Sequence, residues 1–157
     1  HKGIKLEWSK QYVKNAKKAG LIIHGCFMVG NPGDTKETME ETFQLSLKLN
    51  PDTAQFFPLM VYPGTEAYKW AQTRGYLTTN DFSKWVTEDG LHSCIISTPE
   101  ISAEELVAFC DEARRRYYLR PAYIFSKLRQ FIFYPAERKR LLKAGVRFIK
   151  FISKKGK

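Results

Sequence analysis

The fold is decided at Val29-Gly30-Asn31-Pro32-Gly33-Asp34-Thr35, where an apolar run passes into an amphipathic helical pattern. A second turn of this kind, Tyr62-Pro63-Gly64-Thr65, follows the next apolar run and opens another helix. Two successive strand–helix units with glycine at the carboxyl end of each strand are typical of a barrel that binds its ligand at that end. The pattern therefore predicts an α/β fold with a parallel sheet.

The glycines of the first turn point to a ligand site. Glycine lets the backbone turn sharply and approach a ligand closely. We expect Gly30 and Gly33 to leave exposed amides beside a helix amino terminus, where a polar or anionic ligand would be stabilised. The alternative is an ordinary connection in which proline sets φ and Asp34 or Thr35 caps the helix. The tandem occurrence of the two turns favours the first interpretation.

The elements around these turns follow from apolar periodicity and from capping residues. A helix over 6–19 is expected to end at Gly20, and the apolar run over 21–29 predicts a strand covered on both faces. The next helix is expected to end near residue 50, with Glu37 in the capping-box position for Asp34. A strand over 53–61 and a helix from Thr65 to Gly75 complete the second unit.

The rest of the chain reads as helical after one mixed segment. Within 76–100, Cys94-Ile95-Ile96 is either a further strand or a packed loop. A helix is expected to begin at Ser102 with Glu105 in its capping box, and two more helices are expected over 122–134 and 136–152. The pattern predicts three parts: a barrel portion over 1–75, a capping loop and helix over 76–120, and a basic amphipathic tail over 121–157.

The net charge of +10 belongs to this tail. Residues 121–157 hold eleven basic side chains and one acidic side chain, Glu137, while the remaining charges balance. Three interpretations stand: a solvated helix face, an anionic membrane surface reached by phenylalanines and isoleucines among lysines, and nucleic acid. No nucleic-acid-binding motif accompanies the charge, so no nucleic acid is expected.

Length, cysteine content and apolar runs bound the class of protein. The chain has 157 residues, begins with His1 rather than methionine, and reads as a piece of a longer polypeptide. Cys26, Cys94 and Cys110 are odd in number and widely spaced, which argues against a disulfide framework or a four-cysteine metal site and favours small buried hydrophobes. No apolar run reaches bilayer length and no signal peptide pattern occurs, so a cytoplasmic setting is expected, with peripheral membrane contact as a further option.

Several linked motifs carry a family resemblance. They are Gly20, His24-Gly25-Cys26-Phe27-Met28-Val29-Gly30 with the turn after it, Glu37-Thr38, Glu41-Thr42, Pro51-Asp52, Gln55-Phe56, Tyr62-Pro63-Gly64-Thr65 and Arg120-Pro121. Through them the chain resembles the carboxyl-terminal part of radical S-adenosylmethionine enzymes. The resemblance is to the cobalamin-dependent class that includes anaerobic Mg-protoporphyrin monomethyl ester cyclases and hopanoid methylases.

The resemblance implies a fold and a cofactor site. The chain would hold the last two β/α units of a partial (β/α)6 barrel, followed by an α-helical carboxyl-terminal region. In that family the apolar residue two before the strand-end glycine, here Met28, packs against the adenine of S-adenosylmethionine, and backbone near the next turn completes the site. The implied cofactor-binding residues are Met28, Gly30, Asn31, Pro32, Gly33, Val61, Tyr62 and Pro63. Cys26 departs from the family pattern by standing where its first glycine would be.

The resemblance also implies chemistry that these residues alone would not perform. Such enzymes bind a 4Fe-4S cluster through three closely spaced cysteines, reductively cleave S-adenosylmethionine and form a 5′-deoxyadenosyl radical. The present residues lack that cysteine group, so we expect the isolated chain to be inactive. Its partner would be the remainder of the polypeptide, with the cluster-binding barrel half and a cobalamin domain. No catalytic or metal-binding residue is assigned within this chain.

Three further side chains are candidates for a functional role. His24 alternates with Cys26 and Met28 and is expected to be a core residue rather than a catalyst. Tyr62 and Trp70 are candidates for a substrate pocket, and packing is preferred for Trp70.

One alternative function is a non-catalytic membrane- or partner-binding module on an α/β scaffold, and another is a barrel enzyme that binds phosphate through amides at the Gly30 turn. Unpaired strand edges also allow a homodimer.

Overall fold

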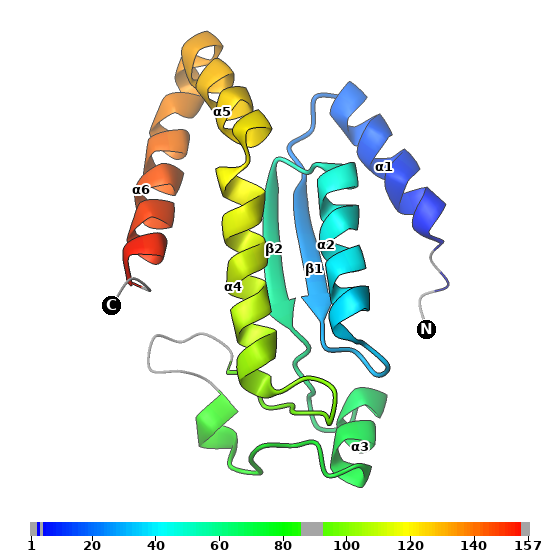
Figure 1. The fold of residues 1–157 in the computed structure, drawn as a ribbon. Coiled ribbons are helices and arrows are strands. Elements are labelled where there is room, and N and C mark those ends of the chain that lie inside the picture. Colours follow the sequence, from blue (N-terminus) through cyan, green and yellow to red (C-terminus); the bar gives the residue numbers. More distant parts are fainter. Residues whose placement is uncertain (1–2, 4, 86–92, 155–157) are drawn as a thin grey trace. The chain divides into compact units, whose positions relative to one another are not determined.

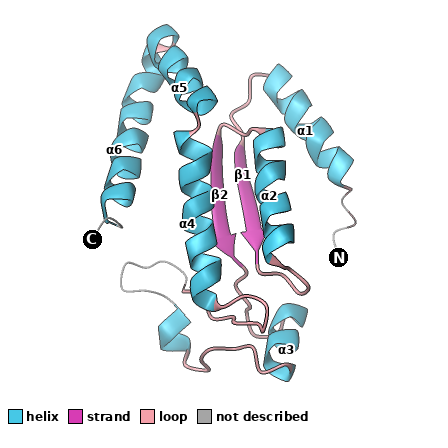
Figure 2. Cartoon of the chain, in the orientation of Figure 1, coloured by secondary structure: helices cyan, strands magenta, loops and turns pink. Residues whose placement is uncertain are grey.

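The structure is a computed structural model that describes residues 3, 5–85 and 93–154. The chain forms two compact units, His1–Arg114 and Arg115–Lys157. The first contains the sheet and the second contains the carboxyl-terminal helices (Figures 1 and 2). The three-part functional division over 1–75, 76–120 and 121–157 stays a prediction.

Two successive strand–helix pairs form the sheet in the first of these compact units. β1 (His24–Val29) leads into α2 (Lys36–Leu49), and β2 (Thr53–Pro58) leads into α3 (Glu66–Thr73). The strands run parallel, from His24 opposite Thr53 to Val29 opposite Pro58. The α/β class and the parallel pairing are thereby confirmed. Two strands make a sheet rather than a barrel, so the partial barrel stays a prediction.

One face of the sheet is buried and the other is open. On the buried face the Phe27 and Phe56 rings stack at 5.4 Å between centroids, and Phe43 of α2 lies 5.9 Å from Phe56. On the opposite face Cys26 and Met28 are exposed. Since side chains alternate along a strand, only one face can be covered by α2. The expectation that β1 is covered on both faces, with Cys26 buried, is wrong for the described residues.

The first helix explains why β1 begins later than expected. α1 (Leu6–Lys18) is capped by Ala19 and followed by Gly20, whose φ of +73° favours glycine. The amide of Leu21 then donates to the carbonyl of Ala16 at 3.0 Å, which is part of the helix-ending hydrogen-bond pattern. Leu21 and Ile22 are exposed rather than paired in the sheet. The apolar run therefore starts in a helix cap and becomes a strand only at His24.

Residues with hydroxyl side chains cap the amino-terminal ends of α2 and of α4 (Ala103–Leu119). The Thr35 hydroxyl accepts from the Thr38 amide at 3.4 Å, and the Thr38 hydroxyl accepts from the Thr35 amide at 2.9 Å. Ser102 and Glu105 make the equivalent reciprocal pair, at 3.1 and 2.9 Å. The Ser102–Glu105 box is confirmed, whereas the expected Asp34–Glu37 box is wrong because Thr35 and Thr38 occupy those roles.

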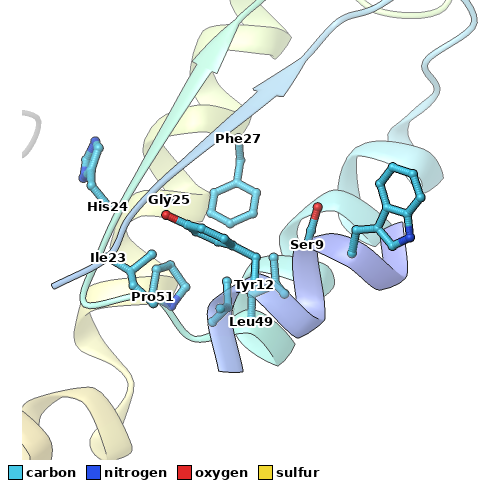
Figure 3. A pocket seen from close by; sticks show the side chains of 10 residues that line it. Ser9, Tyr12, Ile23, His24, Gly25, Phe27, Leu49 and Pro51 are labelled. Atoms are coloured by element: carbon cyan, nitrogen blue, oxygen red, sulfur yellow. The ribbon is translucent and has the colours of Figure 1, made fainter. Parts of the chain in front are cut away.

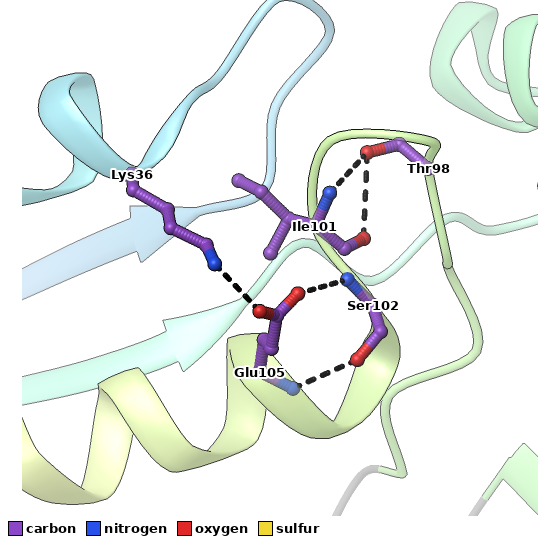
Figure 4. A network of polar contacts seen from close by, with 5 residues as sticks. All are labelled: Lys36, Thr98, Ile101, Ser102 and Glu105. Atoms are coloured by element: carbon purple, nitrogen blue, oxygen red, sulfur yellow. Dashed lines mark hydrogen bonds and ion pairs between the residues drawn. The ribbon is translucent and has the colours of Figure 1, made fainter.

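An ion pair joins the starts of these two helices. The ammonium group of Lys36 lies 2.7 Å from a carboxylate oxygen of Glu105, and the other oxygen of Glu105 accepts from Ser102 (Figure 4). The hydrogen bond from Lys36 lowers the pKa of the Glu105 carboxyl, and the same contact raises the pKa of Lys36. The first turn of α4 is thus held at the edge where the strands end.

A second apolar cluster forms beyond the strand ends. Its buried members are Leu59, Val61, Ala71, Trp85, Ile95 and Ile96. η1 (Phe82–Trp85) supplies the tryptophan, and Ile96 forms a single antiparallel bridge with Leu77. The Cys94-Ile95-Ile96 segment is therefore a packed loop with one bridge. Trp70 lies edge-on to Tyr76 at 5.4 Å, which confirms its packing role.

The second unit holds two carboxyl-terminal helices. α5 (Pro121–Phe133) is joined through η2 (Pro135–Glu137) to α6 (Arg138–Lys154). Proline suits the first position of α5 because its missing N–H would have no helical partner there. The Arg120 guanidinium lies 4.1 Å from the Tyr117 ring centroid, so Arg120-Pro121 has a structural role at this helix start. Within the described residues, no helix combines the length and apolarity needed to cross a membrane.

Candidate functional site

The two glycine turns leave the same edge of the sheet. Because β1 and β2 are parallel, their carboxyl ends lie side by side, with Val29 opposite Pro58. The Leu59 amide donates to the Val29 carbonyl at 2.7 Å, which continues the pairing past the end of β2. The first turn begins at Gly30, and Tyr62 follows three residues after Leu59. The two turns that hold the candidate residues therefore both follow the carboxyl ends of the paired strands.

A carboxylate holds the first turn together. One oxygen of Asp34 accepts from the amides of Gly30 and Asn31, at 2.8 and 2.9 Å, and the other accepts from the Thr38 hydroxyl at 3.1 Å. The expectation that Gly30 offers a free amide to a ligand is therefore wrong. Sequence reasoning treated Asp34 only as a helix cap. Its position four residues after Gly30 was the available signal, since aspartate commonly accepts from nearby turn amides.

This carboxylate changes the kind of ligand that the turn suits. An anion at a helix amino terminus needs amides that point at it and a favourable local charge. Here the amides of Gly30 and Asn31 are already engaged, and the group that engages them is itself negative. Binding of phosphate through the Gly30 amide is therefore disfavoured.

Gly30 is required by its surroundings as well as by its backbone. Its φ is +84°, and a Cβ at this position would lie 3.0 and 3.1 Å from the two methyl groups of Leu106. Leu106 is fully buried on α4. Gly33 has a similar φ of +87° but would meet nothing within 4 Å. The first glycine therefore packs the turn against α4, whereas the second only allows the chain to bend.

The second turn is closed by a threonine. The Thr65 hydroxyl donates to the Tyr62 carbonyl at 2.7 Å and accepts from the Tyr68 amide at 3.2 Å, so it closes the turn and begins α3. Gly64 has a φ of +87°. The Val61 side chain is fully buried in the second apolar cluster, so only its backbone is positioned to meet a ligand.

Two large side chains are exposed at this edge. Met28 is 39% exposed on the open face of β1, and Tyr62 is 48% exposed in the second turn. The other exposed candidates are Asn31, Pro32, Gly33 and Pro63, whereas Gly30 and Val61 are buried. The exposed candidates are therefore one thioether, one phenol ring and the surfaces of two turns. The two large side chains among them are mainly apolar, which suits a flat, weakly polar group better than a charged one.

His24 lies at the opposite end of β1 from these residues. Its side chain is exposed, and Nδ1 lies 2.7 Å from the Thr53 hydroxyl on the neighbouring strand. The expectation of a core histidine is wrong because His24 shares the open face with Cys26 and Met28. His24 therefore lies on the same face of the sheet as Met28, but at the amino-terminal ends of the strands.

The cysteines form no metal site within the described residues. All three are free thiols, and no group of three or more potential ligands occurs in that part of the chain. Burial raises the pKa of the Cys110 thiol to about 12 and also raises that of Cys94. The sequence interpretation as small hydrophobes is right for Cys110, which is buried, and wrong for Cys26.

An apolar groove lies at the amino-terminal end of the sheet. It has a volume of about 470 Å³ and lies between α1, the start of β1 and the end of α2. The Tyr12 ring extends toward Phe27 and Pro51, while His24 points away from them (Figure 3). Ligands of parallel α/β sheets bind at the carboxyl ends of the strands. This groove is at the other end and is therefore not the candidate site.

Comparison with known proteins finds similarity to two proteins that bear the names of enzymes. No family model matches the chain. It is 32% identical over 127 residues to an uncharacterized methyltransferase of Pyrococcus horikoshii, an alignment that covers 81% of this chain and 27% of that protein. It is 25% identical over 114 residues to the anaerobic magnesium-protoporphyrin IX monomethyl ester cyclase of Cereibacter sphaeroides, which covers 73% of this chain and 18% of the cyclase.

These similarities support a radical S-adenosylmethionine or methyltransferase-like relationship. Both relatives bear the names of enzymes, which supports an enzyme-related family. The chain spans about a quarter of the first relative and under a fifth of the second. The activity of a whole enzyme is therefore a proposal for these residues.

Proposed function

We propose that the chain is the carboxyl-terminal portion of a radical S-adenosylmethionine enzyme of the cobalamin-dependent class. It supplies the last two β/α units of a partial barrel, with adenine-side contacts at the carboxyl edge of β1 and β2 and a substrate-facing helical cap. The single observation that carries the proposal is the parallel pairing that brings both glycine turns to one edge. The relationship to a methyltransferase and a cyclase agrees with chemistry of S-adenosylmethionine.

The open face of the sheet supports the same proposal. In a barrel the helices lie outside and the strands turn one face inward. Here α2 covers one face, and the other carries the exposed side chains of Cys26, Met28 and Gln55. Both strands also have an outer edge without a partner strand among the described residues. A sheet of this kind is completed when further strands pair with it.

Each proposed contact has a physical role. The exposed Met28 side chain is apolar and polarisable, which suits packing on an adenine face. Asn31, Pro32 and Gly33 present the surface of the first turn, while Gly30 keeps that turn close to α4. Tyr62 and Pro63, together with the backbone of Val61, form the neighbouring wall. Asp34 holds the first turn rather than touching the ligand.

The other cofactors do not fit these residues. A 4Fe-4S cluster needs three or four closely placed thiolates, and the described residues hold no such group. The cluster and cobalamin therefore belong, in this proposal, to other parts of the enzyme. We expect the isolated chain not to turn over S-adenosylmethionine.

The proposal is tested by the affinity of the complete polypeptide for S-adenosylmethionine, measured by calorimetry. Met28→Ala removes the apolar contact and is expected to weaken binding by about 1–2 kcal/mol, roughly five- to thirtyfold in Kd. Ile22→Ala is the matched control, since Ile22 is exposed and apolar but lies beyond the other end of β1. Equal affinities of the two variants would refute the site.

A further inference from the structure

α6 carries an exposed apolar stripe that the adenosyl site does not use. Leu142, Val146 and Ile149 are 59%, 53% and 64% exposed. They are spaced by four and then three residues, so they share one side of the helix. Burying such side chains in an apolar medium is favourable by roughly 1.5–3 kcal/mol each. A stripe of this kind is typical of a helix with an apolar partner.

Lysines line one flank of this stripe. The helical repeat places Lys139, Lys143 and Lys150 next to Val146 on the helix surface, and all three are exposed. The arginines at the start of α6 are used differently. Arg138 donates to the carbonyls of Phe131 and Ile132 at the end of α5, and Arg140 pairs with Glu137. Within the described residues, these lysines make no ion pair.

α5 adds a second apolar stripe in the same unit. Phe125, Leu128 and Ile132 are exposed and recur after three and four residues. Arg129 follows directly after Leu128 and is also exposed. Both helices of the unit therefore expose apolar side chains among basic ones. One acidic residue, Glu137, lies in 121–157, and Arg140 already neutralises it.

The combination of stripe and charge favours one partner. Nucleic acid would use the lysines but leave the apolar side chains without a role. A second copy of the chain would bring two strongly basic surfaces together. An anionic bilayer uses both features, because acyl chains accept the apolar stripe and headgroups attract the lysines.

We propose that α6 lies in the plane of an anionic membrane surface, with Leu142, Val146 and Ile149 among the acyl chains and Lys139, Lys143 and Lys150 at the headgroups. The exposed apolar side chains of α5 extend the contact. This attachment is separate from the adenosyl site and does not depend on it.

Vesicle flotation of the 157-residue chain tests the proposal. We expect binding to vesicles of phosphatidylcholine mixed with phosphatidylglycerol, weak binding to phosphatidylcholine alone, and a decrease with added salt. Each lysine near an anionic surface contributes about fivefold to partitioning, so Lys139→Gln, Lys143→Gln and Lys150→Gln together should lower it by roughly a hundredfold. Leu142→Gln with Ile149→Gln should lower it by at least about tenfold.

Matched controls separate this contact from general charge and apolarity. Lys10→Gln, Lys14→Gln and Lys18→Gln remove the same charge from α1, and Val107→Gln removes an exposed apolar side chain from α4. Both controls should change partitioning by less than about threefold. Circular dichroism should show unchanged helix content in every variant, because each substituted side chain is exposed and glutamine favours helices.

Three outcomes would overturn the proposal. The first is no binding to the anionic vesicles. The second is a stripe variant that binds the anionic vesicles as well as the unaltered chain does, which would indicate contact through charge alone. The third is a sedimenting dimer that the stripe variant abolishes in the absence of lipid, which would make a second copy the partner.

Discussion

Replacement of Gly30 by alanine tests how the candidate edge is held together. The added methyl group would have to adopt a φ of +84° and would lie 3.0 and 3.1 Å from the two Cδ atoms of Leu106. Gly33 has almost the same φ, +87°, and open space around it. Alanine at either position would therefore lose free energy of unfolding through its left-handed backbone conformation, but only alanine at Gly30 would lose more through crowding against Leu106.

The expected magnitudes follow from this difference. A left-handed conformation costs an alanine about 1–2 kcal/mol, which is the whole effect expected for Gly33→Ala. Gly30→Ala adds overpacking of about 1 kcal/mol, at the lower end of the usual range because Leu106 must shift by only a few tenths of an ångström. We therefore expect a loss of about 2–3 kcal/mol in the free energy of unfolding for Gly30→Ala.

Urea unfolding followed by circular dichroism measures both variants. A double-mutant cycle with Leu106→Val isolates the packing cost, since valine lacks the two Cδ atoms that the new methyl group would meet. In the Leu106→Val background, Gly30→Ala should cost only as much as Gly33→Ala does. A Gly30→Ala loss equal to that of Gly33→Ala, or a cycle without coupling, would show that α4 does not press on the turn.

Two further predictions concern Asp34 and the cysteines. Asp34→Ala should lower the free energy of unfolding by about 1–3 kcal/mol, because the buried Gly30 amide loses its acceptor. Asp34→Asn keeps one side-chain oxygen and should lower the free energy of unfolding by less. Equal losses for the two variants in urea unfolding would contradict the role of the carboxylate. A thiol reagent at mildly alkaline pH should label the exposed Cys26 first and Cys110 only after unfolding. The native Cys110 thiol keeps its proton up to about pH 12, whereas its ordinary pKa is 9.0. The unfolded chain therefore binds fewer protons between these values, and stability should fall as pH rises from about 9 to 12, a decline that Cys110→Ala should reduce.

Local signals in the sequence identified most of the elements correctly. Gly20 and Gly75 end helices with positive φ, Ser102 and Glu105 form a capping box, and Pro121 begins α5. Each of these signals depends on residues within four positions of one another. They can therefore be recognised in the sequence without knowledge of the tertiary structure. The α/β order and the parallel pairing follow from the alternation of such elements.

Wrong expectations arose where a side chain had a choice of partner. Asp34 had two sets of amides within reach, those of the turn and those of the helix, and it bonds to the turn. His24 and Cys26 lie in an apolar run, yet the face that they share is open. Whether a strand is covered on both faces depends on helices distant in the sequence, which the run itself does not specify.

By itself the sequence determined where helices begin and end, that two strands pair in parallel, and that the excess charge lies in 121–157. Those properties depend on backbone conformation and on composition, which are local. Only the tertiary structure decided that Leu106 lies against Gly30, that Asp34 accepts from the turn amides, and that the side chains of Met28 and Tyr62 are exposed. The longest-range of these contacts, between Gly30 and Leu106, joins segments more than seventy residues apart, for which packing, not local preference, selects the partner.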